Sequence, residues 1–104
     1  MNVRALMEQV LLGGGYQIDP VPTAAQARML LAGGRYDLVL TDGLLPDGTG
    51  IHIAEEAERQ GVRAMIVTAY AFQFPKRDLA RYALLLKPVR PDELLEAVHN
   101  VLKP

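Results

Sequence analysis

The stretch VLTDGLLPDGTG, residues 39–50, decides the fold of this chain. The apolar run Leu38, Val39 and Leu40 leads within two residues to a carboxylate, Asp42, and then to a loop of prolines and glycines. Apolar residues at consecutive positions are typical of a parallel-sheet strand that is buried on both faces. Placing a charged carboxylate at the end of a buried strand costs free energy, unless the carboxylate has a partner or a functional role. We therefore expect a buried strand over residues 36–41 that ends in a functional acid.

Outward from this strand, helical and strand-like patterns alternate along the chain. We expect helices over 3–11, 23–31, 49–60, 76–82 and from 91 onward, and further strands over 16–18, 64–67 and 83–86. Thr23 is the expected N-cap of the second helix, and the three glycines at 13–15 should end the first. The alternation predicts an α/β fold, an open parallel sheet with helices on both faces.

Length and composition limit the possible functions. The chain has 104 residues, which suits a single domain over 1–104. Lys and Arg number 11 against 12 Asp and Glu, so no basic surface for nucleic acid or membrane is expected. There is no cysteine, which excludes disulfides and thiolate metal sites. No apolar run approaches the length of a membrane span, and no signal-peptide pattern is present. We expect a cytoplasmic domain without direct nucleic-acid or membrane contact.

Each of the three longer strands ends in a residue able to do chemistry: Asp42, Thr68 and Lys87. Parallel strands with right-handed crossovers bring these ends to one edge of the sheet, where α/β folds place their sites. Alone, each residue has an ordinary explanation, as a turn former, a strand end or a surface lysine. Together they suit an anion formed on Asp42, to which Thr68 donates a hydrogen bond and with which Lys87 pairs.

Three segments resemble a known family: YDLVLTDGLLPDGTG (36–50), VTAY (67–70) and LLLKPVRPDELLEAV (84–98). They look like the receiver domain of bacterial two-component response regulators, and the resemblance covers the chain from Val3 onward. It implies a flavodoxin-like fold and a phosphoryl group accepted by Asp42 from a histidine kinase or phosphotransfer protein.

The resemblance also implies roles for residues around Asp42. Thr68 matches the switch hydroxyl and Lys87 the phosphate-pairing lysine. Pro88 matches the proline of a Lys-Pro step that the family often holds cis. The family binds Mg²⁺, for which Asp42 and the backbone carbonyl of Leu44 match two ligands. We expect Asp47 to hold the turn around Pro46 and Gly48.

The chain departs from the family at its start. Residue 3 already begins the first helix, so the family's central first strand and its acidic cluster would lie before residue 1. We therefore expect a domain truncated at its N-terminus relative to the family, with an incomplete metal site. Four or five lost core side chains would remove ~6–15 kcal/mol, comparable with the stability of a whole domain. Either the strand at 16–18 pairs directly beside that at 36–41, a homodimer covers the gap, or the natural chain starts upstream.

A second departure concerns the switch aromatic of the family, which Leu84 replaces. Tyr82 is close in sequence, but we expect it at a helix end in a different environment. Tyr70, Phe72 and Phe74 either form a docking surface or fold back onto the short helix at 76–82.

Three functions remain open. The leading one is a phosphorelay receiver, a phosphoacceptor signalling domain rather than an enzyme, which acts through a protein partner. The alternative is a pseudo-receiver, a phosphorylation-independent binding or dimerisation module, favoured by the missing acidic cluster and by Leu84. A small α/β enzyme is the weakest, since there is no glycine-rich strand-to-helix loop.

Overall fold

The computed structural model describes residues 3–69 and 76–103, so the predicted roles of Tyr70, Phe72 and Phe74 fall outside it. Five helices and five strands follow one another in this part of the chain: α1 Val3–Gly13, α2 Ala24–Gly33, β1 Leu38–Asp42, β2 Leu44–Leu45, β3 Gly48–Thr49, α3 Gly50–Arg59, β4 Arg63–Thr68, α4 Lys76–Arg81, β5 Ala83–Leu86 and α5 Pro91–Leu102. None of these helices is long and apolar enough to cross a membrane.

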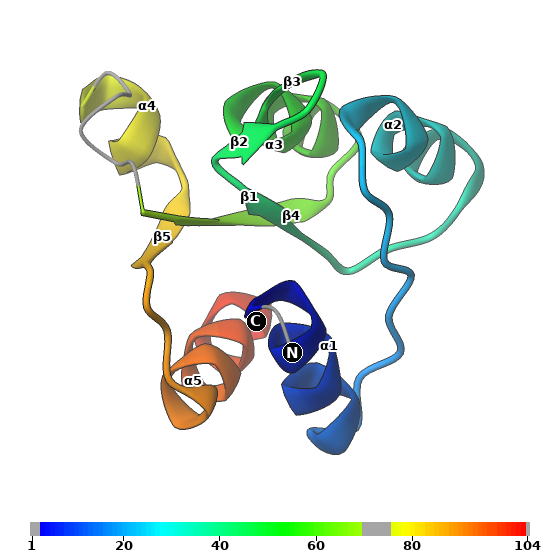
Figure 1. Ribbon diagram of the computed structural model, residues 1–104. Coiled ribbons are helices and arrows are strands. Elements are labelled where there is room, and N and C mark those ends of the chain that lie inside the picture. The colour runs from blue at the N-terminus through cyan, green and yellow to red at the C-terminus, as the bar shows by residue number, and fades with distance from the viewer. Residues whose placement is uncertain (1–2, 70–75, 104) are drawn as a thin grey trace.

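Three strands form a parallel sheet in the order β1-β4-β5. Helices α1 and α5 lie side by side below the sheet, and α2 and α3 lie above it (Figure 1). The short strands β2 and β3 pair antiparallel with each other and form a separate hairpin directly after β1. The predicted α/β class, a parallel sheet with helices on both faces, is confirmed.

The central strand β4 carries the core. Its last four residues, from Met65 to Thr68, are all buried, as expected for a strand covered on both faces. Above the sheet, Ile53 of α3 is fully buried in a cluster with α2. Below it, Leu94 and Val98 of α5 pack with Met65. The helices thus cover both faces of the sheet. The predicted strand-end residues lie at its carboxyl edge.

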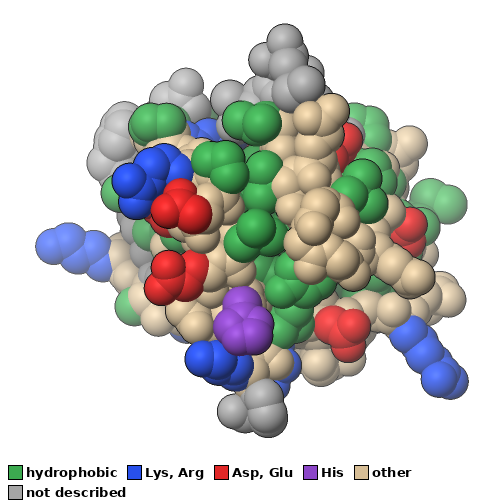
Figure 2. Space-filling view, turned by 90° about the horizontal axis from the view of Figure 1, so that it is seen from below, with side chains coloured by type: hydrophobic (Ala, Val, Ile, Leu, Met, Phe, Trp, Pro, Cys, Tyr) green, Lys and Arg blue, Asp and Glu red, His purple; other side chains and the backbone are tan. Residues whose placement is uncertain are grey.

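The lower face is formed by α1 and α5, and hydrophobic side chains surface between charged ones on it (Figure 2). Met7, Val10 and Leu11 of α1 pack against the cluster of α5. Leu6 and Leu12 of the same helix are exposed. The helix therefore buries only one side, as an amphipathic surface helix does.

The predicted strand at 16–18 is wrong, and so is its pairing beside β1. The N–H of Tyr16 donates to the carbonyl of Leu11 (3.2 Å) and so closes the end of α1. Gly15 has a φ of 91°, the left-handed stop expected after this helix. Pro20 and Pro22 follow and lack the N–H groups that a sheet ladder needs. The N–H of Tyr16 is thus already used, the prolines have none to offer, and the segment runs as an irregular connection to α2.

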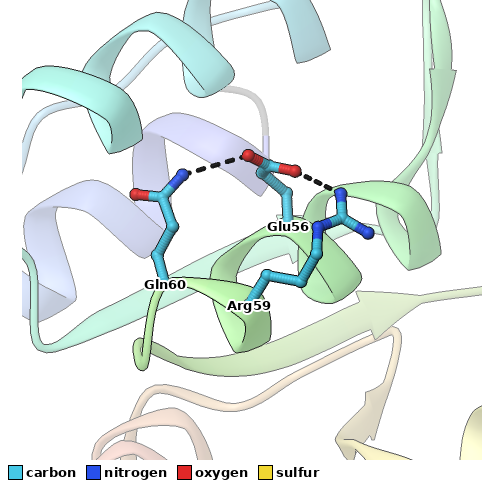
Figure 3. Close-up of polar contacts among 3 residues, drawn as sticks. All are labelled: Glu56, Arg59 and Gln60. Carbon is cyan, nitrogen blue, oxygen red and sulfur yellow. Dashed lines mark hydrogen bonds and ion pairs between the residues drawn. The ribbon is translucent and has the colours of Figure 1, made fainter.

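Side-chain contacts fix the ends of the upper helices. Thr23 caps α2 as predicted, since its side chain accepts a hydrogen bond from the N–H of Gln26. At the C-terminal end of α3, the Glu56 carboxylate accepts hydrogen bonds from Arg59 and from Gln60 Nε2, the latter at 3.0 Å (Figure 3). The bond from Arg59, followed by that from Gln60, lowers the pKa of Glu56. The contacts of Glu56 lie at the C-terminal end of α3, whereas Asp42 lies near its N-terminal end.

Candidate functional site

Asp42 and Lys87 meet at the carboxyl edge of the sheet. Asp42 is the last residue of β1, and Lys87 directly follows β5. Although β4 lies between these two strands, Lys87 Nζ donates to Asp42 Oδ1 at 2.6 Å. The side chains are 28% and 32% exposed for Lys87 and Asp42, respectively, so solvent reaches the ion pair. A charge-assisted hydrogen bond of this length is short and strong.

The backbone around this pair is held by the end of β4. The N–H of Lys87 donates to the carbonyl of Thr68 (3.0 Å), and the N–H of Gly43 donates to that of Val67 (3.3 Å). The end of β4 is therefore hydrogen-bonded both to the segment after β1 and to the segment after β5. The peptide bond between Lys87 and Pro88 is cis.

A pocket of about 220 Å³ opens beside the ion pair and is lined by Asp42, Gly43, Leu44, Ala69 and Lys87. A larger hollow, of about 350 Å³, lies at the opposite edge of the sheet near Arg63 and Arg81. Of these two pockets, the smaller is the candidate site, because it is lined by two of the three predicted strand-end residues, Asp42 and Lys87.

Thr68 ends β4 at the same edge, but its side chain is buried. It is not among the residues that line the pocket; its neighbour Ala69 is. The structure therefore brings Asp42 and Lys87 into contact, whereas Thr68 lies at the same edge with its side chain buried outside the pocket lining.

The two metal ligands predicted from the resemblance, Asp42 and the backbone carbonyl of Leu44, belong to residues that line the pocket. Leu44 lines the pocket two residues after Asp42, which places its backbone next to the acid. Among residues 3–69 and 76–103, no three acidic, histidine or cysteine side chains gather as a metal site would require. Asp19 lies at the other edge, where its carboxylate accepts a hydrogen bond from the Tyr36 hydroxyl (2.6 Å). Mg²⁺ takes oxygen ligands in a near-octahedral arrangement. Of the residues that line the pocket, Asp42 is the acidic one, and its carboxylate is paired with Lys87; the backbone carbonyl of Leu44 is the second oxygen that could serve as a ligand.

Gly50 is a residue of the site that sequence reasoning missed. A Cβ at this position would lie 2.1 Å from the carbonyl oxygen of Asp42. The N–H of Gly50 also donates to the carbonyl of Gly43 at 2.9 Å. The start of α3 can therefore approach the end of β1 only because residue 50 has no side chain. The loop has glycines at 43, 48 and 50, and the sequence does not show which of them lies too close to another backbone segment to carry a side chain.

Asp47, predicted to hold its own turn, binds the start of α2. Its Oδ1 accepts the N–H of Ala24 at 2.8 Å, and its Oδ2 accepts the N–H of Ala25 at 3.1 Å. The hydrogen bond from Ala24, followed by that from Ala25, lowers the pKa of Asp47. A contact between residues more than twenty positions apart has no local sequence signal.

Leu84 and Tyr82 share one environment, so the prediction that they face different ones is wrong. Tyr82 is buried in a cluster with Ile51, Ala54 and Ile66, and Leu84 packs against the same cluster. Residues two apart in an extended segment point to the same face, which explains the result.

Comparison with known proteins identifies the family of this chain. The family described as "Response regulator receiver domain" matches residues 1–99. The chain belongs to this family. Receiver domains act in two-component phosphorelay signalling, in which they interact with histidine kinases or phosphotransfer proteins, and they are signalling domains rather than classical enzymes.

Individual relatives cover most of the chain. It is 30% identical to Sporulation initiation phosphotransferase F of Bacillus subtilis, over 97% of this chain and 86% of that protein. It is 23% identical to Protein PetR of Rhodobacter capsulatus, but spans only 45% of PetR's length. Among solved structures, the response regulator TrrA of Thermotoga maritima, in complex with Mg²⁺ and BeF, is 27% identical with a TM-score of 0.84. That comparison covers 96% of this chain and 90% of TrrA. The predicted receiver fold and signalling class are thus confirmed.

Proposed function

We propose that this receiver domain accepts a phosphoryl group on Asp42 and passes the signal to a protein partner. The observation that carries the proposal is the 2.6 Å contact between Lys87 Nζ and Asp42 Oδ1 beside an open pocket. This contact supports the proposal because both partners are partly exposed to solvent beside the pocket, within reach of a phosphodonor.

The chemistry follows from these groups. A carboxylate oxygen of Asp42 attacks the phosphorus atom of the donor, and the bond from phosphorus to the donor's leaving group breaks. The product is an acyl phosphate, which carries more negative charge than the carboxylate it replaces. Lys87 offsets this charge as a point cation, and positioning and charge stabilisation of this kind account for most of phosphoryl-transfer catalysis.

Thr68 and Mg²⁺ complete the proposal. Thr68 is buried at the end of β4, next to the pocket residue Ala69, and in this proposal its hydroxyl donates a hydrogen bond to the phosphoryl group once the end of β4 shifts toward Asp42. Leu84 replaces the aromatic residue that would couple such a shift to the outer face. Mg²⁺ would neutralise charge on the transferring group, with Asp42 and the Leu44 carbonyl as its protein ligands from the described residues.

The partners follow from the family and from the open edge of the sheet. A histidine kinase or phosphotransfer protein supplies the phosphoryl group in the cytoplasm. A second copy of the chain is the further partner, because β1 pairs with β4 alone in the described sheet and leaves its other edge open. In this proposal residues 1–104 act as one receiver domain that signals through a protein partner.

The test is the intact mass of the chain after incubation with acetyl phosphate and Mg²⁺. We expect one phosphoryl group on the wild type and none on Asp42→Ala. Asp37→Ala is the matched control, because Asp37 is an exposed aspartate just before the start of β1, at the other end of the same strand. Loss of the adduct in both variants, or in neither, would contradict the assignment of Asp42.

A further inference from the structure

The wall of the Asp42 pocket continues into a hairpin that is small and poorly supported by itself. Gly43 and Leu44 line the pocket, and Leu44 begins the hairpin of β2 and β3. Only two residues of each strand pair, Leu44 with Thr49 and Leu45 with Gly48. Isolated hairpins are marginal even when they are longer. The position of this wall therefore depends on contacts outside the hairpin.

The base of the hairpin is held by backbone hydrogen bonds. The N–H of Gly43 donates to Val67 O (3.3 Å), and the N–H of Gly50 donates to Gly43 O (2.9 Å). Both bonds lie at the pocket end, so they do not restrain the opposite end, the turn that contains Asp47.

The turn is restrained by α2. The two carboxylate oxygens of Asp47 accept the N–H groups of Ala24 and Ala25, at 2.8 and 3.1 Å. These are the first two N–H groups of the helix, which have no partner within it, and the helix dipole favours a negative charge there. The next N–H group, that of Gln26, donates to Thr23 Oγ1 at 3.2 Å. One end of α2 is thus shared between a local cap and a long-range one.

We propose that Asp47 is a positioning residue of the receiver domain, whose two hydrogen bonds to α2 fix the Gly43–Leu44 wall against Asp42 and Lys87. This inference rests on the proposed function only in that the pocket receives the phosphoryl group. Asp47 does not line the pocket, so its loss removes no group that would touch the phosphoryl group. Its loss instead makes local opening of the Gly43–Leu44 wall easier.

The chain offers a matched control for this idea. Thr23→Ala removes the local cap of α2, whereas Asp47→Ala removes the cap that comes from the hairpin. Both variants weaken the same end of the same helix. Only Asp47→Ala also removes the hydrogen bonds between α2 and the hairpin, whose Leu45 still packs against the cluster of Ala24 and Ile53, so the difference between the two variants measures the tether.

Amide hydrogen exchange in the full chain, followed by NMR, tests the tether directly. The amides of Gly43 and Gly50 report opening of the wall, and that of Ile66 in β4 reports global unfolding. Relative to Ile66, exchange at Gly43 and Gly50 should rise by about tenfold or more in Asp47→Ala, because local opening becomes easier. In Thr23→Ala it should rise by less than about twofold. Asp47→Asn keeps one acceptor oxygen and should fall between wild type and Asp47→Ala.

A second readout links the tether to the reaction. The rate of phosphorylation by acetyl phosphate should fall by about tenfold in Asp47→Ala and stay close to wild type in Thr23→Ala, since small misplacements in a reactive site are costly. If the wild type takes up no phosphoryl group, the proposed function fails, while the exchange data still decide whether Asp47 positions the wall. Equal exchange at Gly43 and Gly50 in the two variants would overturn the inference and leave Asp47 as a helix cap alone.

Discussion

Replacing Gly50 with alanine tests the closest approach in the site. The new Cβ would lie 2.1 Å from the Asp42 carbonyl oxygen, whereas real Cβ contacts are essentially never shorter than 3.0 Å. The start of α3 and the end of β1 must therefore separate by about 0.9 Å, the difference between those two distances. The neighbour is a backbone carbonyl, so no side-chain rotation relieves the clash.

The expected cost follows from this displacement. Overpacking that moves backbone typically costs about 1–3 kcal/mol. With a urea m-value of about 1–3 kcal/mol/M for a small domain, the unfolding midpoint should fall by about 1 M. Phosphorylation should slow by up to about 100-fold, because Asp42 itself belongs to the displaced segment.

Gly48→Ala is the matched control, since a Cβ at Gly48 would meet nothing within 4 Å. Both variants are compared by urea unfolding, followed by circular dichroism, and by phosphorylation rate. The free energy of unfolding of Gly48→Ala should lie within about 1 kcal/mol of the wild-type value. If Gly50→Ala unfolds at the same urea concentration as Gly48→Ala, the close approach between α3 and β1 does not exist and the reasoning fails.

Three further predictions concern the core, the ion pair and the tether. Ile53→Ala should lower the free energy of unfolding by about 2–5 kcal/mol, because Ile53 is fully buried; a loss below about 1 kcal/mol in urea unfolding would contradict its place in the core. Lys87→Ala should change stability by less than about 1 kcal/mol, since the pair is solvent-accessible, but should slow phosphorylation by about 100-fold; the opposite pattern would make Lys87 a structural residue. The pKa of Asp47 is lowered by its bonds from Ala24 and Ala25, so its stabilising effect is complete above the ordinary aspartate pKa and is lost as pH falls through the lowered value. The difference in melting temperature between wild type and Asp47→Asn should therefore shrink below about pH 4, and a constant difference would show that the charge is irrelevant.

Much of the site could be predicted because strand ends are local signals. The apolar runs before Asp42, Thr68 and Lys87 identify three buried strands, and parallel topology then brings their ends together. The contact between Lys87 and Asp42 spans 45 positions in the sequence, yet it follows from topology alone. The start and composition of α5, with Pro91 at its first position, were likewise readable.

The features that failed depend on long-range packing. The pattern at 16–18 is strand-like, but a strand forms only where its N–H groups find a partner, and that of Tyr16 caps α1 instead. Neither the bond from Ala24 to Asp47 nor the crowding at Gly50 can be read from neighbouring residues. Tyr82 was assigned by its nearness to a helix end, whereas the packing of α3 against the sheet draws it into the core.

The most direct test of the central claim is binding of beryllofluoride, a tetrahedral mimic of a phosphoryl group, in the presence of Mg²⁺ and followed by amide NMR. If Asp42 accepts phosphoryl groups, the shifted amides should centre on Gly43, Leu44, Ala69 and Lys87, the residues that line the pocket with it, and Asp42→Ala should abolish the shifts. A folded wild-type chain whose pocket amides do not move, or whose shifts persist in Asp42→Ala, would contradict the account.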